Sequence, residues 1–150
     1  MFRGVNNINL DTKGRMAVPV RYREQLLQSC NGEMVVTIDT DERCLLIYPE
    51  PEWSDIQRKL EALPSFNGAA RRIQRLMIGH ATDVQMDGSG RILLTPPLRE
   101  YSQLDKKVVL LGLGAKFELW NEEIWVSHRE AWISDSSNQE IPDELRTLSL

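Results

Sequence analysis

The sequence predicts an α+β fold built from two copies of one β-rich unit. The motif Asp-x-x-Gly-Arg occurs at 11–15 and again at 87–91. Each copy is followed by an apolar segment with a proline behind it, a short helical segment and two apolar strands. The offset between the copies is 76 residues at the turns and 72 at Tyr48 and Trp120. An internal repeat of this kind indicates duplicated structural units, with loops of different length between matched elements.

The first copy begins with a short strand that leads into a tight turn. The segment 11–14 fits a type I turn, because an aspartate at its start can accept a backbone hydrogen bond and a glycine at its end tolerates unusual dihedral angles. Pro19 ends the next strand, since proline cannot donate to a β-ladder. In order, the expected elements are a strand at 6–10, the turn, a strand at 16–18, a helix at 21–28, and a hairpin of strands at 34–38 and 44–48.

The second copy repeats this order. Pro96 and Pro97 break the chain after the second strand and precede a short helix. The expected elements are a strand at 81–86, a turn at 87–90, a strand at 91–95, a helix at 98–104, and a hairpin of strands at 107–112 and 116–120.

Helical segments join and follow the two copies. An apolar stripe at helical spacing runs from Trp53 to Leu63. Asn67 is expected to cap a second helix that ends near Gly79, and Asn121 to cap a third. After Ser134 the chain becomes polar and acidic, so we expect a poorly ordered tail. The domain boundaries are therefore placed at 5–50 for the first half unit, 51–80 for the helical linker, 81–124 for the second half unit and 125–150 for the last helix and tail.

The composition is that of an ordinary globular protein, with 150 residues of which 41% are apolar. The sequence contains neither an apolar run long enough for a membrane nor the apolar core of a secretory signal, so we expect a cytoplasmic protein without membrane contact. Cys30 and Cys44 form neither a disulfide framework nor a zinc pattern, and Cys44 is expected to be a buried apolar residue.

The charge is unevenly distributed, although the net charge is −4. Residues 1–25 contain five basic side chains against two acidic ones, and acidic residues gather in 39–42, 50–55 and the tail. A chain with segregated charge can present a basic face while being acidic overall. A second basic group, Arg71, Arg72 and Arg75, is expected to bridge subunits or to pair with Glu52 and Asp55.

No pattern for catalysis is found. The chain has only two histidines and lacks the common nucleophile, zinc and redox motifs. The segment 87–91 has the glycines of a phosphate loop but not the lysine or the long helix that should follow. We therefore expect a protein that is not an enzyme, with no cofactor, no metal and no small-molecule substrate.

The arginines of the two turns leave two interpretations open. In the first, the turns are only structural and Arg15 and Arg91 are ordinary solvated residues. In the second, each arginine binds an anion, because its planar fork of donors suits phosphate and the edge of guanine. Lys13 adds a charge at the tip of the first turn where the second has Ser89. The first turn should then bind an anion more strongly.

Four segments resemble the MraZ family of bacterial regulators: 11–19 with its Asp-Thr-Lys-Gly-Arg turn, 21–24, 75–99 and the closing Phe-Glu-Leu-Trp at 117–120. The resemblance covers roughly residues 1–132. It implies an AbrB-like, swapped-hairpin fold, in which two β-β-α-β half units interlock into one small barrel. The duplicated turn would then be one loop from each half unit.

The resemblance also implies a function. Family members are transcription factors, usually repressors, which bind short repeats in double-stranded DNA as closed homo-oligomeric rings. They act on their own operon in the division and cell-wall gene cluster, so the protein would be nucleoid-associated. Carried over to this chain, the DNA-contacting residues would be Lys13, Arg15 and Arg91, with Arg21, Arg23 and Arg3 as further candidates. Asp11, Gly14, Asp87 and Gly90 would shape the turns without touching DNA.

Two alternatives without a DNA-reading role remain open. One is an antitoxin-like module that binds a partner through its tail. The other is a ring-shaped interaction scaffold held together by Trp53, Trp125 and Trp132.

Overall fold

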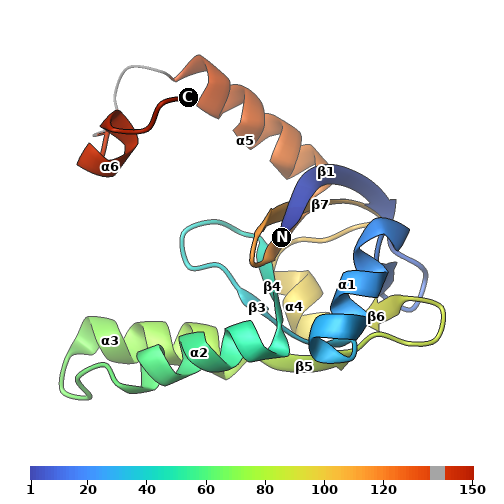
Figure 1. Ribbon diagram of the computed structural model, residues 1–150, viewed down its shortest axis with the longest axis horizontal. Helices are drawn as coiled ribbons and strands as arrows, with labels where there is room; N and C mark the ends of the chain where they lie inside the picture. The colour runs from blue at the N-terminus through green and yellow to red at the C-terminus, as the bar shows by residue number, and fades with distance from the viewer. Residues whose placement is uncertain (136–140) are drawn as a thin grey trace.

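The computed structural model describes residues 1–135 and 141–150 (Figure 1). The first half comprises β1 (Phe2–Asn9), β2 (Arg15–Ala17), α1 (Val20–Cys30), β3 (Glu33–Ile38), β4 (Leu45–Pro49) and α2 (Glu50–Glu61). A connecting segment holds α3 (Gly68–Ile73) and the π-helix η1 (Gln74–Ile78). The second half comprises β5 (Thr82–Gln85), β6 (Arg91–Leu93), α4 (Pro96–Tyr101), β7 (Lys107–Gly114), β8 (Phe117–Asn121) and α5 (Glu122–Ser134), followed by the single-turn helix α6 (Asp143–Arg146). The expected tail falls partly on residues 136–140, which lie outside the described residues.

The strands form two antiparallel sheets. One has six strands in the order β1-β7-β8-β4-β3-β5, and the other is the two-stranded ribbon β2-β6. The expected hairpins β3-β4 and β7-β8 are confirmed. The first strand of each half pairs with the third strand of the other half, β1 with β7 and β5 with β3. The two halves therefore share one sheet, and neither can complete it alone.

The α+β class is confirmed, but the expectation of a closed barrel is wrong. β1 and β5 are the two ends of the six-stranded sheet, and within the described residues they do not pair with each other. The short strands β2 and β6 have three residues each, and they pair only as a separate ribbon. The tight turn before each strand and the proline after it limit their length, so the ribbon covers the sheet instead of extending it.

The ribbon is anchored to the main core by its inward side chains. Met16 and Ile92 face each other at its centre, and each is 1% exposed. They belong to one apolar cluster with Leu26 of α1, Leu98 of α4 and Phe117 of β8. Burying a side chain of this size stabilises a fold by about 1.5–3 kcal/mol. The ribbon, and the turns at its ends, are thus fixed to the body of the protein.

The helices outside this core form two projections: α2 with the α3–η1 segment, and α5 (Figure 1). α2 lies beside the α3–η1 segment, and the side chain of Gln74 donates to the Leu60 carbonyl across this pair at 2.8 Å. The expected cap of α3 by Asn67 is confirmed. The sequence predicted one regular helix after this cap, whereas the structure has a π-turn in which the Met77 carbonyl accepts from the hydroxyl of Thr37 on β3 at 2.6 Å.

The expectations for the charged and aromatic residues of these helices need correction. Asp55 pairs with Arg58 of its own helix. The basic side chains Arg71, Arg72 and Arg75 are exposed, and the alternative expectation that they bridge subunits stays a prediction. Trp53 is 3% exposed and packs inside the chain, so it does not present a contact surface. Trp132 near the end of α5 is 45% exposed, as a surface residue would be.

Candidate nucleic-acid interface

The first turn is closed by the carboxylate of Asp11. Its Oδ1 accepts the backbone N–H groups of Lys13 at 2.9 Å and Arg15 at 2.8 Å. The backbone N–H of Gly14 donates to the Asp11 carbonyl at 3.1 Å, and Gly14 has a φ of +80°. A left-handed conformation of this kind is one that glycine adopts most readily. The sequence motif thus encodes the turn through the carboxylate of Asp11, which accepts the backbone hydrogen bonds, and through Gly14, which adopts the left-handed conformation.

The same carboxylate also orients the arginine. Nε of Arg15 donates to Oδ2 of Asp11 at 2.7 Å. An arginine has five N–H donors, so this contact occupies one and leaves the four on the terminal nitrogens. The side chain is about one-third exposed, and Lys13 at the turn tip is exposed. The guanidinium is therefore held at Nε by Asp11, and a ligand can reach the N–H donors on its terminal nitrogens.

The second turn repeats this geometry. Oδ1 of Asp87 accepts the backbone N–H groups of Ser89 and Arg91, each at 2.9 Å. Oδ2 accepts from Nε of Arg91 at 3.2 Å, and Gly90 has a φ of +76°. Ser89 takes the place of Lys13, so the second turn has one positive charge fewer at its tip.

Hydrogen bonding lowers the pKa of both aspartates. The backbone N–H of Arg15 is the largest cause for Asp11, and that of Arg91 is the largest for Asp87. Each bond favours the charged carboxylate, which keeps the pKa below the ordinary value of 3.8. At neutral pH both turns therefore hold a carboxylate that anchors an arginine.

The ribbon places the two arginines on one face. In the register of β2 and β6, Arg15 lies opposite Leu93 and Ala17 lies opposite Arg91. Because side chains alternate along a strand and the central pair faces the core, all four of these residues lie on the outer face. Diagonal neighbours across an antiparallel pair are roughly 7–8 Å apart. The ribbon thus joins the two anchored arginines into one positively charged surface.

Arg21 and Arg3 lie in another neighbourhood, at the start of β1. The guanidinium of Arg21 bonds Oδ1 of Asn6 and lies 4.8 Å from the centre of the Tyr22 ring. Arg3 is exposed on β1, and its carbonyl accepts from the Tyr22 hydroxyl at 2.6 Å. Arg21 is thus held against β1, whereas the side chain of Arg3 is free to meet solvent.

Arg23 lies beside the second turn. It is half-buried, and its Nε donates to the Val18 carbonyl at 2.7 Å. Its guanidinium lies against Gly90 of the second turn. Arg99 of α4 has the equivalent place in the other half, since its Nε donates to the Leu94 carbonyl at 2.9 Å and its guanidinium lies against Gly14.

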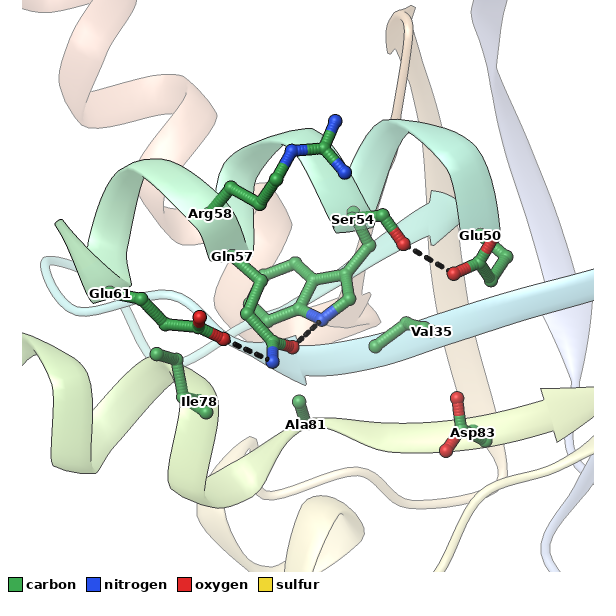
Figure 2. A pocket seen from close by; sticks show the side chains of 10 residues that line it. Val35, Glu50, Ser54, Gln57, Arg58, Glu61, Ile78, Ala81 and Asp83 are labelled. Carbon is green, nitrogen blue, oxygen red and sulfur yellow. Dashed lines mark hydrogen bonds between the residues drawn. The ribbon is translucent and has the colours of Figure 1, made fainter.

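A pocket of about 400 Å³ lies between α2, β3 and η1 (Figure 2). The ring nitrogen of Trp53 donates to Gln57 at 2.9 Å. Gln57 in turn donates to Glu61 at 2.8 Å, as Figure 2 shows. These polar groups therefore hydrogen-bond to one another along α2. Over residues 1–135 and 141–150, no group of three or more His, Cys, Asp or Glu side chains could hold a metal ion. In the same ranges no helix has the length and apolar character needed to cross a membrane.

Comparison with known proteins identifies the family. A model described as "MraZ protein, putative antitoxin-like" matches residues 1–76 and again residues 77–146. The chain belongs to the MraZ family. The boundary between the two matches falls within η1, so each match covers one of the halves that interlock in the sheet.

Several MraZ relatives align over their full length. Proteins named "Transcriptional regulator MraZ" from Halorhodospira halophila and Alkalilimnicola ehrlichii are each 54% identical to this chain, over 152 and 150 residues. One from Coxiella burnetii, with the same name, is 55% identical over 152 residues. In each case the alignment covers 100% of both chains.

Sequence reasoning overlooked Arg99. The 76-residue offset that relates Arg15 to Arg91 also relates Arg23 to Arg99. That offset was enough to pair the two residues, but it could not show what they contact. Each Nε contact is five residues away in the same half, but the glycine that each guanidinium lies against is in the opposite half, and only the interlocked fold brings the two together.

Proposed function

We propose that this protein is a transcriptional regulator that binds double-stranded promoter DNA through the β2–β6 ribbon and its two turns. One observation carries the proposal: Arg15 and Arg91 share the outer face of the ribbon, and each is anchored at Nε by a turn carboxylate. The names of the MraZ relatives support the same function.

The geometry suits DNA for a physical reason. The major groove admits a two-stranded β-ribbon, and an arginine reads guanine through paired donors on its terminal nitrogens. Those donors are the ones that the aspartates leave available in Arg15 and Arg91. Lys13 adds a phosphate contact beside Arg15. Because the side chain is held before binding, less conformational entropy is lost when DNA is bound.

Assembly would raise the affinity of a small surface. We propose a closed homo-oligomeric ring of swapped-hairpin, AbrB-like protomers, which presents several ribbons to a run of short DNA repeats. Linked sites can gain ~10²–10⁴ in affinity without any new contact. The target would be the promoter of the protein's own operon in the division and cell-wall gene cluster, where binding represses transcription. The protein would then work in the cytoplasm, at the nucleoid.

The test is whether the protein selects its own promoter. The purified protein is titrated into a fluorescent duplex from upstream of its gene, and into a duplex of the same composition in scrambled order. Its mass in solution is measured by light scattering. We expect the promoter duplex to bind at least 10³-fold more tightly, as specific sites do, and a mass of several protomers. Equal affinity for the two duplexes would contradict sequence-specific regulation.

The exposed end of α5 favours a second candidate, a protein-interaction module. Trp132 and Ile133 are 45% and 69% exposed, and the family description includes the word antitoxin-like. If neither duplex binds while a chain ending after Ser134 loses self-association, this candidate replaces the regulator.

A further inference from the structure

Each half of the chain supports the turn of the other half through one arginine. In the first link, Nε of Arg23 donates to the Val18 carbonyl at 2.7 Å, and the N–H of Val18 donates to the Gly90 carbonyl at 2.8 Å. The backbone of Val18 is therefore held on one side by the helix α1 and holds the second turn on its other side.

The second link is the counterpart of the first. Nε of Arg99 donates to the Leu94 carbonyl at 2.9 Å, and the N–H of Leu94 donates to the Gly14 carbonyl at 3.0 Å. Here a residue of the second half holds the first turn, where Lys13 and Arg15 lie. Both links thus cross from one half to the other.

The arginines also lie directly on the turns. A methyl group on Gly14 would come within 2.8 Å of Cζ of Arg99, and one on Gly90 within 2.5 Å of Cζ of Arg23. Carbon atoms in contact are normally about 3.5–4.0 Å apart. The absence of a side chain at each glycine is therefore what lets the guanidinium lie over the turn.

We propose that Arg99 and Arg23 are crossed positioning residues: Arg99 fixes the first turn and Arg23 fixes the second. Neither acts as a DNA contact of its own. The effect on DNA binding rests on the proposed function, whereas the positioning itself does not. Because the first turn has the additional charge of Lys13, replacing Arg99 should weaken DNA binding more than replacing Arg23. This order is unexpected from the sequence, in which Arg23 is the arginine nearer to Arg15.

The positioning is tested without DNA, by NMR hydrogen exchange of the turn amides. In Arg99→Ala, the amides of Gly14 and Arg15 should exchange about five-fold faster or more, the effect expected from loss of one hydrogen bond, while those of Gly90 and Arg91 keep their rates. In Arg23→Ala the pattern should reverse.

The matched controls are the neighbouring residues Glu24 and Glu100, which are exposed and also related by the 76-residue offset. Glu24→Ala and Glu100→Ala should leave both turns unchanged. Arg23→Lys and Arg99→Lys serve if an alanine variant does not fold, because lysine keeps the charge but has no donor at the position of Nε. Urea unfolding of every variant separates a local effect from a loss of global stability. Faster exchange in the same half as the substitution, or equally in both turns, would overturn the proposal.

Double-mutant cycles then connect the links to DNA affinity. Arg99→Ala should lose most of its effect on affinity when Arg15 is already alanine, and Arg23→Ala when Arg91 is already alanine. The uncrossed pairs should be additive. Additivity in all four pairs would overturn the role in DNA binding. If the wild type does not bind promoter DNA at all, the proposed function fails, while the exchange pattern still decides whether the links position the turns.

Discussion

Replacing Gly90 by alanine tests the physical description of the turns. Gly90 has a φ of +76°, and the added methyl group would lie 2.5 Å from Cζ of Arg23. The left-handed conformation costs an alanine roughly 1–2 kcal/mol. The side chain of Arg23 is flexible enough to move away, so the contact costs about one hydrogen bond, ~1 kcal/mol.

One effect works in the opposite direction. Replacing glycine reduces the conformational freedom of the unfolded chain, which favours folding by about 0.4–1 kcal/mol. The net destabilisation is therefore about 1–3 kcal/mol. For a protein of about this size each kcal/mol lowers the Tm by roughly 2–4 °C, so the midpoint should fall by roughly 2–12 °C.

The assay is thermal and urea unfolding followed by circular dichroism, at one fixed protein concentration because oligomers gain stability with concentration. The same turn supplies the control. Gly88 has no atom within 4 Å of an added methyl group, and Thr12 has the equivalent place in the first turn. Gly88→Ala should therefore stay within about 0.5 kcal/mol of the wild type. Equal stability of the two variants would refute the reasoning.

Three further predictions concern the carboxylates, a thiol and the core. The carboxylates of Asp11 and Asp87 have a lowered pKa, so their support of the turns is complete above about pH 3.8 and is lost as the pH falls through the lower folded-state value. The NMR shifts of the turn amides should therefore titrate with a midpoint below pH 3.8. A midpoint above pH 3.8 would contradict the hydrogen bonding of the two carboxylates. Burial raises the pKa of the Cys44 thiol, so a thiol reagent should label it only as the protein unfolds, and rapid labelling of the folded protein would show that the site is open. Leu94→Ala should lower the free energy of unfolding in urea by about 2–5 kcal/mol, because the side chain of Leu94 is fully buried. Leu93→Ala should lower it little, because the side chain of Leu93 is 50% exposed. Similar losses in the two variants would mean that the ribbon is not anchored as described.

The sequence was most informative where contacts are local. The motif Asp-x-x-Gly-Arg predicted both turns, because its donors and acceptors lie within five residues of one another. Apolar runs on either side of a short loop predicted both hairpins, and Asn67 and Asn121 act as the helix caps that were expected. In all of these cases the partner of each group is close in the chain.

The features that escaped prediction depend on contacts distant in the chain. Arg23 was expected as a candidate DNA contact, but the sequence could not show that its guanidinium lies against Gly90, because that contact depends on how the halves interlock. The π-turn at Met77 accompanies a hydrogen bond from Thr37, 40 residues away. The closed barrel was expected from the family resemblance, and the strand order shows an open sheet with a separate ribbon.

The most direct test of the account is the salt dependence of promoter binding by the wild type, Arg15→Ala and Arg58→Ala. Arg58 is an exposed arginine of α2, so its removal changes the net charge equally but leaves the ribbon intact. If the ribbon is the reading surface, Arg15→Ala loses most of its affinity and its log–log salt slope falls by about 1 per arginine displayed to DNA, while Arg58→Ala binds as the wild type does. If folded Arg15→Ala binds with the affinity and slope of Arg58→Ala, the ribbon does not contact DNA and the central claim is wrong.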